Sequence, residues 1–184
     1  MLMEEKMSKA ELVGEKIIIW DREDSNNIFN NGWYGELFED RLELALVEAA
    51  LLLERKKIEI KKGKKNLDFQ SFYKIVTKLD DRFHTRYVVY KDLRERGLPV
   101  RTGFKFGCDF RVYERGVSPL KKGPKQAHEH TKWVVFCIPE NYTCSFQELS
   151  RAVRLAHNIR ANMLWAVIDT DSDTTYYEIK FLSP

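Results

Sequence analysis

Apolar positions in the first part of the chain change their period several times, as expected of alternating strands and helices. Residues 16–20 are a β-rich apolar run that predicts a strand, closed by the polar stretch 21–27 and by turn residues at 30–32. From 42 to 53 the apolar residues follow helical spacing with glutamates between them, which predicts a helix. The segment therefore has the pattern of a mixed α/β unit.

A short strand and a second helix complete this unit. Residues 58–60 alternate isoleucine with a charged residue, as in a strand with one buried face. The lysine-rich segment 61–65 contains a glycine and predicts a basic turn. Asp68 then stands in an N-cap position before a helical pattern. We expect a small N-terminal α/β domain over residues 1–84, with its boundary in the stretch 81–85.

The second part of the chain predicts more strand than helix. An amphipathic helix over 87–97 ends at Gly97, a favourable C-terminal stop. Ser145 is placed to cap a second helix that runs to about Arg160. Strand-like segments occur at 99–102, 109–113, 133–138, 163–168 and 174–181. The expected fold class is α/β (α+β), with a C-terminal domain over residues 85–184 built on a mixed sheet.

Composition narrows the class of protein. Hydrophobic residues make up 43% and charged residues 32% of the 184 positions, which is typical of a globular domain. The longest apolar stretch, 44–53, contains Glu48 and is too short for a membrane span. The first twelve residues carry acids and no apolar run, so we expect no signal peptide and a cytoplasmic protein. Three cysteines without a Cys-x-x-Cys pair predict free thiols: Cys108, Cys137 and Cys144.

Charge is unevenly distributed, although the net charge of +3 is mild. The segment 117–132 alone carries four lysines and one acid, a net charge of +3, and it contains two prolines and a glycine. The charged residues are Lys121, Lys122, Lys125, Glu129 and Lys132. We call this segment the basic loop. It suits contact with phosphates, while a solvated surface loop is the simpler interpretation of charge alone.

Two constellations would point to metal chemistry. His128 and His130 lie two residues apart, so on a strand they would share one face, but a third ligand such as Asp109 would have to come from elsewhere in the chain. A metal-dependent nuclease with an Asp…Glu-x-Lys motif is the second possibility. The tripeptide at 59–61 has the Glu-x-Lys form, but it precedes Asp109 and lies in the other unit. Both signals are weak.

A third constellation combines Tyr113 with His130. A hydroxyl and an imidazole can act as base and acid on RNA, whose own 2′-OH is then the nucleophile. Tyrosine is a poor base near neutral pH, since its reference pKa is about 10, unless a cation lies beside it. A neighbouring lysine or arginine is therefore a chemical requirement of this hypothesis. Without further support, the tyrosine is as readily a packing residue and the histidine a structural one.

Several linked motifs, in order, resemble the archaeal tRNA-splicing endonucleases (tRNA-intron lyases). These motifs are YVVYKDLRERG at 87–97, VRTGFKFGCDFRVYERG at 100–116, EHT at 129–131, VRLAHNIR at 153–160, the acidic turn 169–173 and the tyrosine pair 176–177. The resemblance covers the whole second unit, with looser similarity in the first. It implies a restriction-endonuclease-like C-terminal domain and an endoribonuclease activity on precursor tRNA.

The resemblance implies roles for individual residues. Tyr113 would be the general base on the 2′-OH and His130 the general acid toward the leaving 5′ oxygen. Cleavage would need no metal ion or other cofactor and would leave a 2′,3′-cyclic phosphate and a 5′-hydroxyl. The substrate would be a bulge-helix-bulge, with Arg154 stacked on a bulged base and Tyr176 or Trp165 as its aromatic partner.

The sequence departs from the family at one position. A lysine is expected after Arg160, and Ala161 stands there instead. Loss of one electrostatic stabiliser typically costs about 10²–10³ in rate. Three explanations remain: an inactivated variant, a natural non-catalytic structural subunit, or replacement by another lysine such as Lys132 or one in the basic loop. The retention of Tyr113 and His130 favours the first.

The resemblance also implies contacts beyond the cleavage site. The basic loop resembles a lysine-bearing insertion, and Lys121, Lys122 and Lys125 would contact RNA near the bulge. The acidic turn would dock into a neighbouring subunit through Asp169, Asp171 and Asp173, although a plain Asx turn is the simpler interpretation. Both a homo-oligomer and a two-plus-two assembly with a second endonuclease subunit remain open. A metal-dependent DNA nuclease is the weaker alternative from another class.

Overall fold

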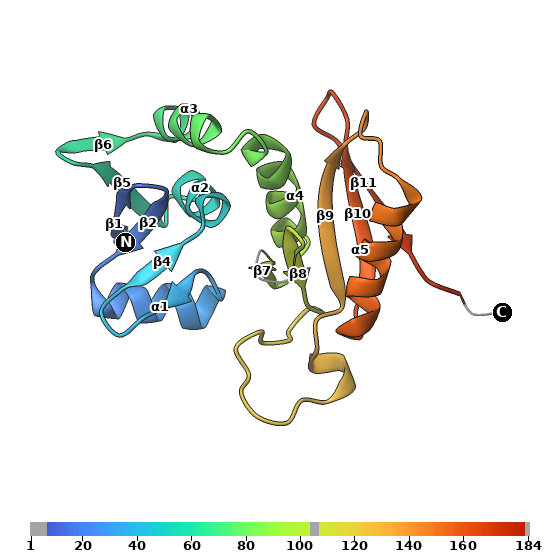
Figure 1. Cartoon of the computed structure of the whole chain (residues 1–184). Helices are drawn as coiled ribbons and strands as arrows, with labels where there is room; N and C mark the ends of the chain where they lie inside the picture. Colours follow the sequence, from blue (N-terminus) through green and yellow to red (C-terminus); the bar gives the residue numbers. More distant parts are fainter. Residues whose placement is uncertain (1–6, 104–106, 183–184) are drawn as a thin grey trace. The chain divides into compact units, whose positions relative to one another are not determined.

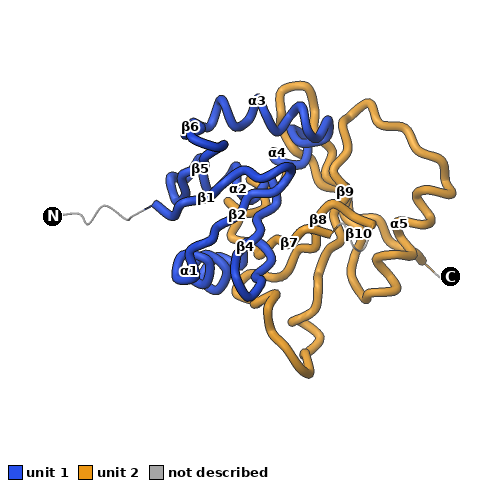
Figure 2. Tube along the Cα trace, turned by 60° about the vertical axis from the view of Figure 1, so that its left-hand side comes forward, with its two compact units in different colours: residues 1–87 blue, residues 88–184 orange. Residues whose placement is uncertain are grey.

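The computed structural model describes residues 7–103 and 107–182 and divides into two compact units, 1–87 and 88–184 (Figure 2). The first half of the stretch considered above for a signal peptide, and residues 104–106 of the second motif, lie outside the described residues. Within the described ranges, no helix combines the length and apolar character needed to cross a membrane.

Unit 1 is built on a six-stranded mixed sheet in the order β3-β4-β2-β1-β5-β6 (Figure 1). Its strands are β1 Ser8–Val13, β2 Lys16–Ile19, β3 Glu36–Leu37, β4 Leu42–Leu44, β5 Ile58–Lys62 and β6 Lys65–Leu67. The β1–β5 pair is parallel and the remaining pairs are antiparallel. The isoleucines of β2 and β5 are buried, which is why these apolar runs form central strands.

The polar stretch after β2, predicted only to close that strand, is a helix that continues through residues 30–32, so the turn predicted there was wrong. Helix α1 spans Arg22–Gly32. It begins at an N-cap, because the Asp21 side chain accepts a hydrogen bond from the Asp24 N–H at 2.9 Å. The buried Ser25 hydroxyl donates to the Ile19 carbonyl at 3.0 Å. The N-cap and the hydrogen bond from Ser25 thus stabilise a helix that has no apolar stripe in its sequence.

The helical pattern from 42 to 53 contains two elements. Residues Leu42–Leu44 form β4, and α2 begins only at Leu46 and ends at Glu54. Glu48 explains why an acid interrupts this apolar run. It is 2% exposed, and its carboxylate accepts from the Gly35 N–H at 3.1 Å and the Ala45 N–H at 2.9 Å. The glutamate is therefore a buried capping group instead of part of a solvated helix face.

Helices α3 and α4 follow the predictions more closely. Helix α3 spans Phe69–Leu79, and the Asp68 carboxylate accepts from the Ser71 N–H at 2.7 Å, which confirms the predicted cap. Helix α4 spans Phe83–Glu95 and crosses the division between the two units. Gly97 follows it with φ of 76°, a left-handed conformation that ends the helix.

Unit 2 has a five-stranded mixed sheet in the order β11-β10-β9-β8-β7. Its strands are β7 Val100–Thr102, β8 Phe110–Val112, β9 Trp133–Pro139, β10 Asn162–Ile168 and β11 Thr174–Ile179. Strands β9 and β10 are parallel and are joined by α5, Phe146–Asn158, while the other pairs are antiparallel. Figure 1 shows the sheet between α4 and α5. The expected α/β class with mixed sheets is confirmed.

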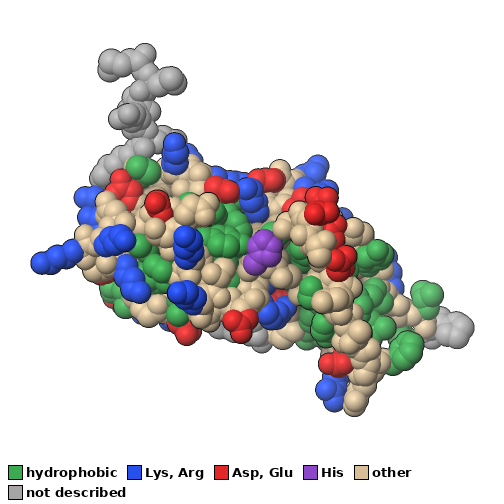
Figure 3. Space-filling model, turned by 90° about the horizontal axis from the view of Figure 1, so that it is seen from above, with side chains coloured by type: hydrophobic (Ala, Val, Ile, Leu, Met, Phe, Trp, Pro, Cys, Tyr) green, Lys and Arg blue, Asp and Glu red, His purple; other side chains and the backbone are tan. Residues whose placement is uncertain are grey.

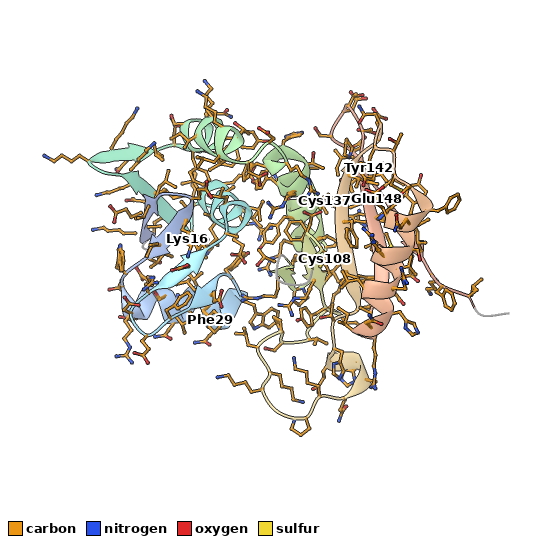
Figure 4. All side chains as sticks on the ribbon, in the orientation of Figure 1. Lys16, Phe29, Cys108, Cys137, Tyr142 and Glu148 are labelled. Atoms are coloured by element: carbon orange, nitrogen blue, oxygen red, sulfur yellow. The ribbon has the colours of Figure 1, made fainter. Side chains whose placement is uncertain are left out.

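The three cysteines are free thiols. Cys108 and Cys137 are buried within unit 2, beside β8 and on β9 (Figure 4). Burial raises the pKa of the Cys108 thiol to about 11, so it stays protonated and unreactive at neutral pH.

The first residues of α5 are fixed by a reciprocal cap, in which the Ser145 hydroxyl accepts from the Glu148 N–H and the Glu148 carboxylate accepts from the Ser145 N–H.

Candidate functional site

Strand register brings three distant parts of the sequence to one end of the unit 2 sheet. Val112 at the end of β8 pairs with Trp133 at the start of β9, and Trp133 pairs with Asn162 at the start of β10. The residues one step outward from this line are Tyr113, Lys132 and Ala161. The Lys132 N–H donates to the Val112 carbonyl, and the Asn162 N–H donates to the Lys132 carbonyl, both at 2.8 Å. We call Tyr113, Lys132 and Ala161 the edge row.

Tyr113, the predicted base, is almost entirely buried. It is 3% exposed, and its N–H donates to the Pro99 carbonyl at 3.0 Å. The backbone is thus fixed at the end of β8, and packing holds the ring. Proton transfer would use only the hydroxyl tip of this side chain, since so little of the residue reaches solvent.

His130, the predicted acid, lies at the same end of the sheet in a more open position. It follows the short 3₁₀ helix η2, Ala127–Glu129, and adopts an extended conformation two residues before Lys132. His130 is exposed, as is His128 within η2. The structure therefore places both histidines in the last part of the basic loop, directly before β9. An exposed imidazole beside a strand end is available to a bound RNA.

Lys132 is the cation of the edge row. Its Nζ lies 2.7 Å from the Glu114 carboxylate, which accepts a hydrogen bond from it, and 4.6 Å from the centre of the Trp133 ring. The hydrogen bond from Lys132 lowers the pKa of Glu114. This ammonium is held by an acid on one side and an aromatic ring on the other, so it has a defined position.

Ala161 offers no polar side-chain group at the position where the family resemblance implies a lysine. It follows Arg160, which has φ of 57°, and its N–H donates to the Ala156 carbonyl at 2.9 Å. Its side chain packs on the buried cluster that includes Val134 and Met163. Ala161 also lines a pocket of about 140 Å³ whose lining residues, all in the described part of unit 2, include His157 and Lys180 but neither Tyr113 nor His130.

The basic loop is partly neutralised by its own acid. Lys121 forms an ion pair with Glu129, and the same carboxylate accepts from the Gln126 N–H at 2.7 Å. Hydrogen bonds from Lys121 and then from the Gln126 backbone lower the pKa of Glu129. Lys122 is exposed and Lys125 half-buried. Of the three lysines predicted to contact phosphates, Lys121 would therefore have to leave Glu129 before it could do so.

Arg154 and Tyr176 lie on opposite faces of the sheet. Arg154 is exposed on α5, and its Nε donates weakly to the Ser150 carbonyl at 3.4 Å. Helix α5 packs on the face that carries Met163 and Trp165. Tyr176 on β11 pairs with Ala166 on β10. Since Ala166 follows Trp165 and side chains alternate along a strand, Ala166 and Tyr176 lie on the opposite face. The structure thus brings Trp165, and not Tyr176, to the side of the sheet on which α5 lies.

Tyr176 belongs to a polar cluster with α4 that the sequence reasoning missed. Its hydroxyl donates to the Asp92 carboxylate at 2.6 Å, and Arg96 donates to the same carboxylate at 2.8 Å. The Arg96 guanidinium also lies 5.5 Å from the centre of the Tyr176 ring. Burial and then the hydrogen bond to Asp92 raise the pKa of Tyr176. The four-residue spacing of Asp92 and Arg96 could have predicted their ion pair on a helix. The sequence gives no such signal for Tyr176, because it lies 84 residues from Asp92.

The acidic turn lies at the end of the sheet away from the edge row, between β10 and β11 (Figure 1). The Asp169 carboxylate accepts from the N–H groups of Asp171 and Asp173 at 3.0 and 2.9 Å, so it shapes the turn itself. Asp171 and Asp173 are exposed. These two carboxylates, and not Asp169, are the ones that point outward for contact.

The residues considered for metal binding are not gathered together. Asp109 is 4% exposed, and its carboxylate accepts from the Cys137 N–H at 2.8 Å, while His128 and His130 are exposed. The tripeptide 59–61 lies on β5 in unit 1. Within the described ranges, no three His, Cys, Asp or Glu side chains are grouped so that they could hold a metal ion.

Comparison with known proteins identifies both units. Residues 8–73 match the family model of the tRNA intron endonuclease N-terminal domain, and residues 83–176 match that of the tRNA intron endonuclease catalytic C-terminal domain. A tRNA-splicing endonuclease of Thermococcus kodakarensis is 39% identical over 171 residues, which cover 93% of this chain and 96% of that protein. One of Methanothermobacter thermautotrophicus is 35% identical over 177 residues, covering 96% and 98%.

Proposed function

This chain belongs to the tRNA intron endonuclease family, and we propose that it acts on precursor tRNA at the two intron–exon junctions of a bulge-helix-bulge. The observation that supports this function best is the edge row. Register alone gathers a tyrosine and a lysine at one sheet end, with His130 on the adjoining segment. Base, acid and cation are the three groups that metal-free cleavage of RNA requires.

The proposed reaction is a transfer of phosphate within the RNA. Tyr113 takes the proton of the 2′-OH, whose oxygen attacks the adjacent phosphorus. His130 gives a proton to the leaving 5′ oxygen as its bond to phosphorus breaks. The products are a 2′,3′-cyclic phosphate and a 5′-hydroxyl, and no metal ion or other cofactor takes part. The exposure of His130 suits a group that meets substrate directly.

Ala161 limits this reaction in the chain as it stands. A methyl group cannot stabilise the crowded phosphorane charge, and loss of one such stabiliser costs about 10²–10³ in rate. Lys132 is adjacent in the edge row, but its ammonium is already bound by Glu114. We therefore propose slow cleavage that retains the family chemistry. A structural subunit is the second candidate, and the observation that favours it is Ala161 itself.

Substrate contacts extend from this end of the sheet. Lys122 and Lys125 of the basic loop, with Lys121 once it leaves Glu129, would contact the phosphates that flank the bulge. The exposed Arg154 on α5 would stack on a bulged base. Asp171 and Asp173 would dock into a basic site of a neighbouring subunit, either a second copy or a different endonuclease chain.

The deciding experiment measures single-turnover cleavage of a bulge-helix-bulge RNA in EDTA by the given chain and by its Ala161→Lys variant. We expect the variant to be about 10²–10³ faster, with cuts at both bulges. Tyr113→Phe in the same Ala161→Lys background is the matched control and should return the rate to that of the given chain or below. Activity that disappears in EDTA would instead favour a metal-dependent nuclease. Absence of cleavage by both proteins, even with a partner subunit, would leave the structural-subunit function.

A further inference from the structure

Positive charge is concentrated in one short segment of unit 1, far along the sequence from the predicted site. Residues 55–65 contain seven cationic residues and a single acid, Glu59, for a net charge of +6. The whole chain has a net charge of +3, so all the other residues together carry −3. This segment, which we call the basic hairpin, thus has twice the net charge of the basic loop in fewer residues.

The basic hairpin begins directly after α2, contains β5 and ends at the first residue of the edge strand β6. Its turn at Gly63 has φ of 59° and places Lys62 directly across from Lys65. Figure 1 shows this turn at the tip of the β5–β6 pair. Figure 3 shows Lys and Arg side chains gathered at the same side of the molecule. Lys56, Lys62, Lys64 and Lys65 are exposed.

Like charges face each other in this turn. Lys62 and Lys65 are cross-strand partners, and like charges directly opposite destabilise a strand pair. Side chains alternate along β5, so Glu59 lies on the opposite face of the sheet from Lys62, next to Lys9 of β1. The Asp68 carboxylate is occupied as the cap of α3, where it accepts a hydrogen bond from the Ser71 N–H. This hydrogen bond lowers the pKa of Asp68 most, and the nearby charge of Lys65 lowers it further. In the described residues, Lys62, Lys64 and Lys65 form no ion pair with an acid.

We infer that the basic hairpin is a second RNA contact surface, which binds backbone phosphates of the tRNA body outside the cleavage site. Four lysines within residues 61–65 offer a polyanion several phosphate contacts at once, and binding would remove the repulsion between Lys62 and Lys65. Double-stranded RNA is read mainly through its backbone and shape. The contact is therefore independent of the intron, and this proposal rests on the tRNA substrate proposed above.

The test measures the dissociation constant for a precursor tRNA and for the same tRNA without its intron, over a range of salt concentrations. The full chain is compared with a variant in which Lys61, Lys62, Lys64 and Lys65 are replaced by Gln. We expect Kd to rise roughly 10- to 100-fold near 50 mM salt for both RNAs, and the slope of log Kd against log salt to fall by roughly 0.7–0.9 per lost contact. Circular dichroism should show an unchanged fold.

A matched pair of double variants separates local contact from net charge. Lys62→Gln/Lys65→Gln removes two charges from the hairpin, and Lys74→Gln/Lys78→Gln removes two exposed charges from α3 of the same unit. Only the hairpin pair should weaken binding and reduce the salt slope. Equal effects of both pairs, or no effect of the hairpin pair, would overturn the proposal. If the unsubstituted chain binds neither RNA, this proposal and the proposed function both fail; if it binds both but Ala161→Lys never cuts, only the function fails.

Discussion

The basic loop of unit 2 and the basic hairpin of unit 1 look alike in sequence and differ in structure. Both are lysine-rich segments around a glycine. In the loop, Lys121 and Lys132 are bound by Glu129 and Glu114. In the hairpin, Lys62 faces Lys65 across the turn. The number of lysines in a segment therefore gives its charge but not how many of them can bind a phosphate. That second number depends on whether acidic side chains nearby in space already form ion pairs with the lysines.

The largest effect should come from the lysine of the loop that ends in the edge row. Lys132→Ala should slow the residual cleavage by the given chain by about 10²-fold, because it removes the cation next to Tyr113 and Ala161. Single-turnover rates with saturating protein measure this step. Lys122→Ala, an exposed loop lysine outside the row, is the control and should change the rate less than threefold. An unchanged rate in Lys132→Ala would mean that another cation serves the reaction.

A second pair of variants should separate the two segments by substrate. Replacing Lys121, Lys122 and Lys125 by Ala should weaken cleavage of non-standard bulges most, roughly tenfold, while binding of intron-free tRNA changes little. Replacing the hairpin lysines by Gln should weaken binding of all tRNAs alike. The measurement is cleavage of a standard and a relaxed bulge by both variants, in the Ala161→Lys background. Identical substrate profiles for the two variants would remove the distinction.

Repulsion in the hairpin predicts a small gain of stability when one of its lysines is neutralised. Lys62→Gln should raise the free energy of unfolding by roughly 0.2–1 kcal/mol, the usual cost of a like-charge cross-strand pair. Urea denaturation at low salt measures the change, and the gain should shrink as salt screens the pair. Lys122→Gln in the loop is the control, for which we expect no gain. Loss of stability in Lys62→Gln would show that the lysine pair is not repulsive.

The smallest effect concerns the pairing of the loop and its pH dependence. Glu129→Gln should raise RNA affinity about two- to fourfold near neutral pH, because Lys121 is then free to contact phosphate. The pKa of Glu129 is lowered in the folded chain, so the ion pair is intact above the ordinary carboxylate range and is lost as pH falls through the lowered value. The affinities of variant and original chain should therefore differ by a constant factor from pH 6 to 8 and converge only as the pH falls below the ordinary carboxylate range. Divergence at low pH would contradict this pairing.

Local signals in the sequence predicted most elements of the fold. The caps at Asp68 and Ser145 were correct, and the strands of unit 2 lie where the apolar runs placed them. Helix α1 was missed because it has little apolar periodicity and depends on Asp21 and on a buried hydroxyl. Residues 42–44 were assigned to a helix because a short strand and a buried helix share an apolar pattern.

The site was only partly accessible from the sequence. Tyr113 and His130 could be proposed from motifs, and Ala161 from the departure at the expected lysine. The position of Lys132 between Tyr113 and Ala161 depends on the register of β8, β9 and β10. Tyr176 could not be separated from Trp165 as a partner of Arg154, since which face of a sheet a helix covers is a tertiary property.

The sequence by itself determined the periodic elements, the caps and the family motifs, because each of these depends on residues close together in the chain. It also determined the total charge, which is a sum over all residues wherever they stand. Only the tertiary structure decided which of those residues meet. Hydrogen-bonded register places Lys132 beside Tyr113 and Ala161 and sets Lys62 against Lys65, while the path of the basic loop brings Lys121 to Glu129. Charge acts over a few ångströms of space, so its effect follows from the fold and not from spacing along the chain.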